Sequence, residues 1–108
     1  MVIDDPNIQI CYNDKILAEY KDVFARDKFK KYNFDATAFN DFISFIKATG
    51  FLLNPVASSV HFADEDDRIF YDTAKQSNAI LVTGNIKHFP KEQSVMLPDK
   101  YIQKMTVV

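Results

Sequence analysis

The stretch FADEDDRIFYDTA, residues 62–74, opens with a run of acids and passes directly into an apolar pattern. Asp64 or Asp66 can cap a helix at this point, because an aspartate side chain accepts hydrogen bonds from the first free backbone amides. Acids also suit the positive end of the helix dipole. The inward face of this helix is expected at helical spacing, on Ile69, Phe70, Thr73 and Ala74. The stretch therefore predicts a helix with an acidic start and an apolar flank.

The residues that follow this helix predict two strands and a last helix. Residues 79–83, AILVT, form an uninterrupted apolar run of the kind that is buried on both faces of a parallel sheet. Residues 95–97, VML, are expected as the last strand. Pro98 and Asp99 can then open a short helix that continues through Met105.

The same alternation precedes the acidic stretch. Residues 8–12, IQICY, predict a strand, and Asn13 can cap a helix over residues 14–25. The buried stripe of that helix is expected on Ile16, Leu17, Tyr20, Val23 and Phe24. Asp35 can cap a further helix over residues 36–49.

That further helix completes the pattern. Its inward residues are expected to be Phe39, Phe42, Ile43 and Ile46. Gly50 ends it, and residues 51–56, FLLNPV, predict a strand that Pro55 terminates. Strands thus alternate with helices, which favours an α/β sandwich with a mainly parallel sheet. The 108 residues are enough for one domain with a single core.

Composition narrows the classes of function. The formal charge of −2 lacks the basic excess that is typical of non-specific nucleic-acid binders. The single cysteine, Cys11, excludes an internal disulfide framework and is expected as a buried thiol in a reducing compartment. No apolar run approaches membrane-spanning length. We therefore expect a soluble, cytoplasmic protein.

Three polar features are expected at the carboxyl ends of the strands, where open α/β sheets place their functional crevice. They are the acidic cluster, the corner Thr83-Gly84-Asn85 after the apolar strand, and Glu19 at the margin of the first helical stripe. Clustered hard oxygen ligands suit Mg²⁺ or Mn²⁺. A metal held in this way can activate water and stabilise charge on a phosphodiester.

Three stretches carry a resemblance to a known family. NDKILAEYKDVF, DEDDRIFYDTAKQSNAILVTGNIKHFP and VMLPDKYI resemble the PIN domain, and more closely its branch of toxins from toxin–antitoxin systems. The resemblance runs from about Ile8 to the C-terminus. It implies a three-layer α/β/α sandwich and a Mg²⁺- or Mn²⁺-dependent endoribonuclease. It also implies RNA as substrate and an antitoxin-like protein as partner.

The resemblance assigns roles to individual residues. Glu19 in "AEY" corresponds to the acid on the family's early helix, and Asp67 to the acid that opens its later helix. Asp64 is a frequent companion in this branch, so the implied catalytic residues are Glu19, Asp67 and Asp64. Asn85 stands where the family has the Asp of "TGD". The implied metal ligands are Glu19, Asp67 and Asn85.

Two departures from the family pattern shape the expected activity. The family begins with a strand that ends in Asp-Thr-Asn and a helix, whereas here residues 1–4, MVID, lead through Asp5-Pro6-Asn7 directly into the next element. Asn85 can coordinate through its carbonyl oxygen but contributes no charge. We therefore expect one N-terminally incomplete PIN-like domain over residues 1–108, with weakened or lost nuclease activity. The open sheet edge favours a homo-oligomer, most simply a dimer.

Plainer interpretations stand beside these. The acids can be helix caps and a solvated charge run, with Glu65 and Asp66 expected on the surface. Gly84-Asn85 is ordinary turn chemistry, and His88 is expected to pack and hydrogen-bond in a loop. Arg68 can flank the site as a phosphate contact. The alternative function is a non-catalytic PIN-like module that binds an antitoxin-like protein or its own copy.

Overall fold

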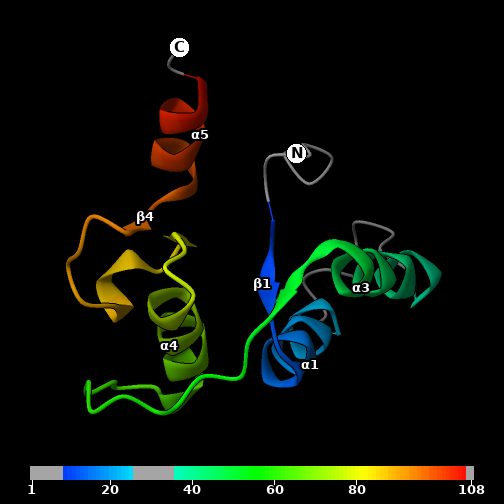
Figure 1. Cartoon of the computed structure of the whole chain (residues 1–108), viewed down its shortest axis with the longest axis horizontal. Helices are drawn as coiled ribbons and strands as arrows, with labels where there is room; N and C mark the ends of the chain where they lie inside the picture. The colour runs from blue at the N-terminus through cyan, green and yellow to red at the C-terminus, as the bar shows by residue number, and fades with distance from the viewer. Residues whose placement is uncertain (1–8, 26–35, 107–108) are drawn as a thin grey trace. The chain divides into compact units, whose positions relative to one another are not determined.

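The computed structural model describes residues 9–25 and 36–106. The chain divides at Asn54 and Pro55 into two compact units. Figure 1 colours the first unit from blue to green and the second from lime to red, and the position of one unit relative to the other is not determined. Each unit combines helices with one pair of short parallel strands, so the chain is a mixed α/β protein.

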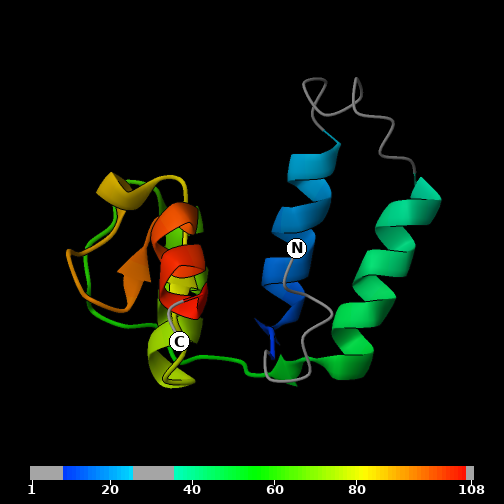
Figure 2. The ribbon, with the colours of Figure 1, turned by 90° about the horizontal axis from the view of Figure 1, so that it is seen from above.

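The described residues of the first unit form a strand and a helix before residue 26, and a helix and a strand after residue 35. β1 (Cys11–Tyr12) leads into α1 (Asp14–Phe24), and α3 (Ala36–Thr49) leads into β2 (Phe51–Leu52). The two strands pair in parallel. Figure 2 shows α1 and α3 side by side, and the Tyr20 and Phe42 rings meet between them with centroids 6.3 Å apart.

Asn13 connects three parts of this unit. Its side-chain Oδ1 accepts a hydrogen bond from the Ile16 amide at 3.0 Å, and its Nδ2 donates to the Leu53 carbonyl at 3.0 Å. The predicted helix cap is therefore confirmed. The second bond joins the start of α1 to the chain that follows β2, and Asn13 is 1% exposed as a result.

The second unit has a small, mainly aromatic core to which α4 contributes Tyr71. After the 3-10 turn η2 (Glu65–Asp67) come α4 (Arg68–Gln76), β3 (Leu81–Val82) and the turn η3 (Ile86–His88). β4 (Val95–Met96) pairs in parallel with β3 and leads into α5 (Pro98–Thr106). The buried core consists of Phe62, Tyr71 and Val95, with Val60, Leu81 and Phe89 packed against it.

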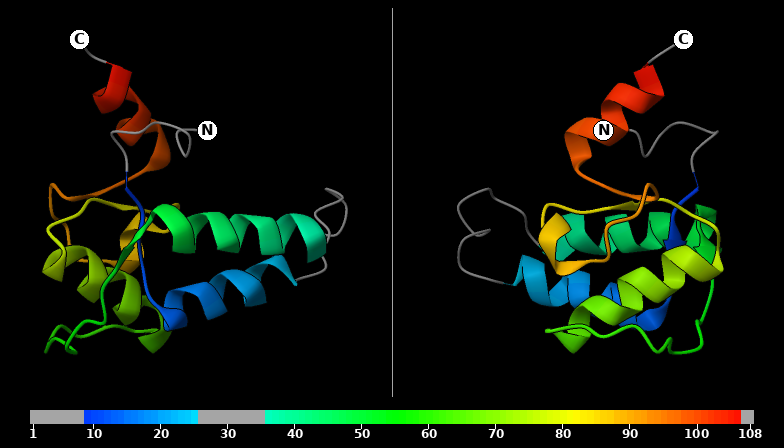
Figure 3. Two further views of the ribbon diagram at one scale, coloured as in Figure 1. Left: turned by 45° about the vertical axis from the view of Figure 1, so that its right-hand side comes forward. Right: turned by 90° about the vertical axis from the view of Figure 1, so that its left-hand side faces the viewer.

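Figure 3 shows the extended chain before η2 running along α4, and side chains of α4 hold it by hydrogen bonds. Gln76 Oε1 accepts from the Val56 amide at 2.9 Å, and Gln76 Nε2 donates to the Val56 carbonyl. Asp72 Oδ2 accepts from the Ser58 amide at 2.9 Å. Four helical residues advance about 6.0 Å and two extended residues about 6.6 Å. The two repeats nearly match, so one face of α4 can bind alternate residues of the extended chain.

A second polar cluster fastens the loop between η3 and β4 to α4. Tyr71 donates its hydroxyl to Glu92 Oε1 at 2.8 Å, and Lys75 Nζ lies 3.2 Å from Glu92 Oε2. Burial, followed by the bond to Glu92, raises the pKa of Tyr71 to about 12. Tyr71 therefore remains a neutral hydrogen-bond donor throughout the physiological pH range.

The helices lie close to their predicted bounds, whereas the strands are shorter. The apolar run at residues 79–83 contributes only Leu81 and Val82 to a strand. It is also not buried on both faces, because Ile80 is 36% exposed and Val82 is 40% exposed. Likewise, residues 51–56 pair only at Phe51 and Leu52. The cap proposed for Asp35 and residue 8 of the first strand lie outside the described residues.

The inward face of α4 also differs from the expected one. Thr73 and Ala74 are buried as predicted, but Tyr71 and Asp72 are buried beside them, whereas Ile69 and Phe70 are only half-buried. The reason is that α4 is covered by the polar segment it binds as well as by the aromatic core.

Candidate acidic site

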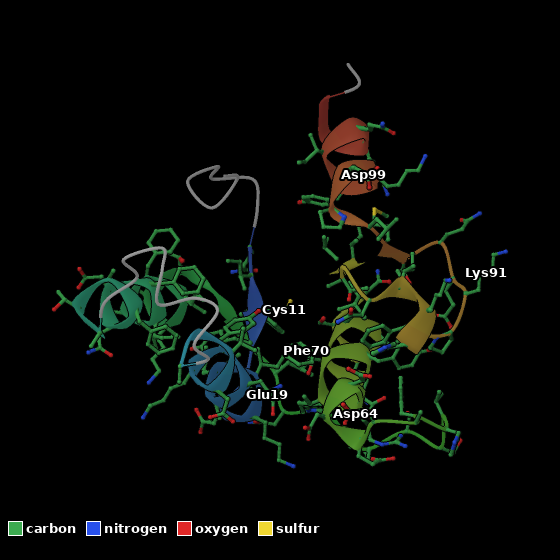
Figure 4. All side chains as sticks on the ribbon, turned by 180° about the vertical axis from the view of Figure 1, so that it is seen from behind. Cys11, Glu19, Asp64, Phe70, Lys91 and Asp99 are labelled. Atoms are coloured by element: carbon green, nitrogen blue, oxygen red, sulfur yellow. The ribbon has the colours of Figure 1, made fainter. Side chains whose placement is uncertain are left out.

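The acidic run folds into a tight capped turn before α4. Asp64 has an extended backbone, and its Oδ1 accepts a hydrogen bond from the Asp66 amide at 2.9 Å. The Asp64 carbonyl accepts from the Asp67 amide at 3.1 Å. Of the two capping candidates, Asp64 caps the turn η2, whereas the cap position of α4 itself is Asp67, whose side chain makes no capping hydrogen bond. Figure 4 shows Asp64 at the start of the helical segment.

Asp67 is the most enclosed carboxylate of the run. Asp64, Glu65 and Asp66 are exposed, whereas the Asp67 side chain is 19% exposed. Burial raises the pKa of Asp67 above its ordinary value, and the negative charge of Asp64 adds to the rise. Asp67 is thus a partly desolvated carboxylate in a negative field.

A histidine from the turn η3, which follows β3 in the chain, contacts this carboxylate. His88 Nδ1 lies 3.3 Å from Asp67 Oδ2, while 54% of the His88 side chain remains exposed. Interaction with His88 lowers the pKa of Asp67, against the larger effects of burial and Asp64. The expectation that His88 packs and hydrogen-bonds in a loop is compatible with this contact, but it did not name Asp67 as the partner.

The corner after β3 sets the position of His88. The Asn85 amide donates to Thr83 Oγ1 at 3.0 Å, and the Asn85 carbonyl accepts from the His88 amide at 2.9 Å. In a 3-10 turn, side chains three residues apart lie on the same side. The spacing in TGNIKHF indicates only that His88 lies on the same side of this turn as Asn85, and its contact with Asp67 comes from tertiary packing.

Arg68 has a structural role at the same helix start. Its guanidinium donates to both carboxylate oxygens of Glu65, to the carbonyl and hydroxyl oxygens of Ser58, and to the carbonyl of Val60. It also lies over the Phe62 ring, 5.2 Å from the centroid. These contacts engage all three guanidinium nitrogens. Arg68 is therefore committed to holding the chain before η2, and is not placed as a phosphate contact.

Glu19 lies on α1 in the first unit, where it is half-buried (Figure 4). The structure therefore brings Asp64, Asp67 and His88 into one neighbourhood, with Asn85 on the adjoining turn. The predicted grouping of Glu19 with these residues joins the two units, and it stays a prediction.

The side-chain oxygens near Asp67 are of the type that binds a divalent cation, but too few of them are grouped together to hold one. Carboxylate and amide oxygens are the ligands that Mg²⁺ and Mn²⁺ prefer. However, within residues 9–25 and 36–106 no three His, Cys, Asp or Glu side chains are grouped so that they could hold a metal ion. The described part of the second unit thus supplies an incomplete set of ligands.

Comparison with protein-family models, curated proteins and solved structures gave no match to this chain. The class that the structure defines is a mixed α/β protein with parallel strand pairs. The likeness to PIN domains rests on the sequence motifs quoted above. None of the helices in the described part of the chain is long and apolar enough to cross a membrane.

Proposed function

We propose that the chain is a PIN-like α/β/α domain with an acidic site around Asp67, related to the metal-dependent endoribonuclease toxins. Its nuclease activity is weakened or lost. The observation that carries the proposal is the state of Asp67, a half-buried carboxylate at a helix start with a second carboxylate beside it. A cation would offset both the lost hydration and the repulsion from Asp64.

Two features support weakness rather than full activity. Asn85 replaces an anionic ligand by a neutral amide, and Mg²⁺ loses its bound water reluctantly unless strong ligands replace that water. In addition, Asp67 already has a partner in His88. The proposed ligands are Asp67 and Glu19, with Asn85 contributing its carbonyl oxygen and Asp64 adding charge. When bound, Mg²⁺ or Mn²⁺ would supply an activated water and stabilise charge on an RNA phosphodiester.

A calorimetric titration with Mn²⁺ tests this proposal, with single-stranded RNA cleavage measured on the same samples. We expect weak Mn²⁺ binding that Asp67→Asn abolishes, together with slow or undetectable cleavage. Asp66→Asn is the matched control, because it removes an exposed acid from the same turn. Absence of Mn²⁺ binding in the wild type, or equal loss in the two variants, would contradict a site centred on Asp67.

A second candidate function is a non-catalytic module that associates through β3. In the parallel pair, the backbone amides of Leu81 and Thr83 donate to the chain at β4. Because backbone groups alternate along a strand, the N–H and C=O groups of Ile80 and Val82 point to the opposite edge. The side chains of Ile80 and Val82 are also substantially exposed. An apolar edge that has no strand partner among the described residues of its unit can accept an extended strand, and we take a second copy of this chain as the partner.

Light scattering during size exclusion tests the second candidate. We expect a dimer that Val82→Lys converts to a monomer, whereas Val56→Lys, at a residue 79% exposed elsewhere in the same unit, leaves it unchanged. A monomeric wild type at all concentrations would contradict self-association. Binding of an antitoxin-like protein by that monomer would assign the edge to a different partner.

A further inference from the structure

We propose that Asn54 and Pro55 form a hinge between the two units, and that the side-chain amide of Gln76 is the clamp that keeps this hinge short. The chain passes from the first unit to the second between Asn54 and Pro55. The hinge concerns this connection alone. It is independent of the acidic site and of the function proposed for that site.

Leu53, directly before the hinge, is bound to the first unit through both of its backbone groups. Its amide donates to the Tyr12 carbonyl at 3.0 Å, and its carbonyl accepts from Asn13 Nδ2 at 3.0 Å. Asn13 is itself buried at the start of α1. Because the peptide group is planar, holding its oxygen also holds the nitrogen that follows. The first unit therefore fixes the chain up to the nitrogen of Asn54.

Val56, directly after the hinge, is bound to the second unit in the same way. Gln76 Oε1 accepts from the Val56 amide at 2.9 Å, and Gln76 Nε2 donates to the Val56 carbonyl. The side-chain amide thus pairs with the N–H and C=O of one residue, as a neighbouring antiparallel strand would. The Val56 side chain is 79% exposed, so these bonds rather than apolar packing hold the residue. The second unit therefore fixes the chain from the Val56 amide onward.

Little rotational freedom remains between the two anchors. It consists of φ and ψ of Asn54 and ψ of Pro55, because the proline ring fixes its own φ. Pro55 also restricts Asn54 to extended conformations. Release of Gln76 would move the next anchor to Ser58, whose amide donates to Asp72 Oδ2. The maximal distance between the anchoring Cα atoms would then rise from about 11 Å to about 18 Å.

Pulsed electron resonance between two spin labels measures this hinge in the whole chain. The labels are attached through Lys21→Cys in α1 and Lys91→Cys in the second unit, both at exposed positions, in a chain that also carries Cys11→Ser. We expect Gln76→Ala to broaden the distribution of distances between the labels about 1.4-fold, since the dimensions of a flexible link grow with the square root of its length and the link doubles. Pro55→Gly should broaden the distribution as well, because it frees the backbone without removing either anchor.

Lys75→Ala is the matched control, because it removes a long exposed side chain from the same turn of α4 whose partner is Glu92. It should leave the distribution unchanged, and equal broadening in this control would overturn the clamp. Hydrogen exchange at the Val56 amide shows whether Gln76→Ala has opened the clamp. Unaccelerated exchange, or accelerated exchange with unchanged breadth, would also overturn the clamp. Unchanged breadth in Pro55→Gly would overturn the hinge itself.

Discussion

Asp64, Asp66 and Asp67 lie within one turn of chain, yet their surroundings give them different properties. One side-chain oxygen of Asp64 accepts a hydrogen bond from the Asp66 amide, and the Asp66 side chain is exposed to solvent. Asp67 is partly desolvated by burial. Identical side chains thus become a cap, a surface charge and a candidate ligand. The difference comes from the 3-10 turn, which points successive residues in different directions.

The raised pKa of Asp67 has a consequence for stability. Burial raises this pKa above the ordinary value of 3.8, so the folded state favours the protonated carboxyl. The resulting stability is fully present below pH 3.8 and is lost as the pH rises through the raised pKa of the folded protein. At neutral pH we therefore expect Asp67→Asn to raise the free energy of unfolding slightly, by at most about 1 kcal/mol.

Urea unfolding of the wild type and Asp67→Asn across pH measures this effect. The difference between the two proteins should shrink toward zero at acidic pH, where the wild-type carboxyl is also neutral. Loss of the His88 contact reduces the gain at neutral pH. A variant that is less stable than the wild type at pH 7 would show that His88 outweighs the effects of burial and Asp64.

Gly50 is packed so closely against backbone that there is no space for a larger side chain. A Cβ at this position would lie 2.6 Å from the Ile46 carbonyl oxygen and 2.7 Å from that of Ile10. Both atoms belong to backbone that cannot move cheaply, so Gly50→Ala should lower the free energy of unfolding by about 2–3 kcal/mol.

Gly84→Ala is the control for this substitution, because a Cβ there meets nothing within 4 Å and the residue has no positive φ. We expect it to change stability by less than about 0.5 kcal/mol. Thermal unfolding followed by circular dichroism distinguishes the two. Similar melting temperatures for both variants would mean that α3 and β1 do not approach Gly50 closely.

At the scale of elements, α4 has two partners of different chemistry. One flank contributes Tyr71 and Ala74 to the apolar interior, while Asp72 and Gln76 bind the extended chain before η2. The Asp72 side chain is 2% exposed, and its Oδ1 has no hydrogen-bond partner among the described residues. The bond from Ser58 therefore compensates only part of the cost of burying this carboxylate.

Hydrogen exchange at Val56 tests how the extended chain is held. In Gln76→Ala the Val56 amide loses its acceptor, and we expect its exchange to accelerate about five- to tenfold, the equivalent of one hydrogen bond. Gln76→Glu is the control, because it keeps an acceptor for this amide while losing the donor to the Val56 carbonyl. Equal exchange rates in the two variants would contradict the bond seen here.

The helices could be predicted from the sequence more closely than the strands. Caps are local chemistry, and Asn13 and Asp64 occupy the cap positions that their sequence contexts indicate. The extent of a strand depends on its partner instead. β1 ends where Asn13 turns the chain into α1, so β2 loses its partner soon after Leu52 despite the apolar residues around it.

In the candidate site, too, local features could be predicted from the sequence, whereas tertiary contacts could not. The cap at Asp64 and the corner at Asn85 follow from neighbouring residues and could be predicted. The approach of His88 to Asp67 depends on how η3 packs against the start of α4, a tertiary arrangement that no local pattern encodes. The hydrogen bonds of Arg68 could not be predicted for a similar reason, since several of its acceptors come from a segment that precedes the helix.

At the scale of the whole molecule, one part of the proposed function involves both units: Glu19 of the first unit and Asp67 of the second are proposed to bind the same cation. The structure defines each unit by itself. Asp67 has neighbouring oxygens from Asp64 within its own unit, whereas Glu19 enters through the sequence motif alone. A measurement that observes both units at once is therefore needed to test this proposal.

Paramagnetic broadening of amide NMR signals by Mn²⁺ is that measurement. We predict that the amide signals of Glu19, Asp67 and Asn85 lose intensity together at the lowest Mn²⁺ concentrations. We also predict that Asp67→Asn abolishes all three losses. Broadening confined to one unit, or equal broadening at a surface acid distant in the chain such as Asp99 with the same concentration dependence, would contradict a shared cation site.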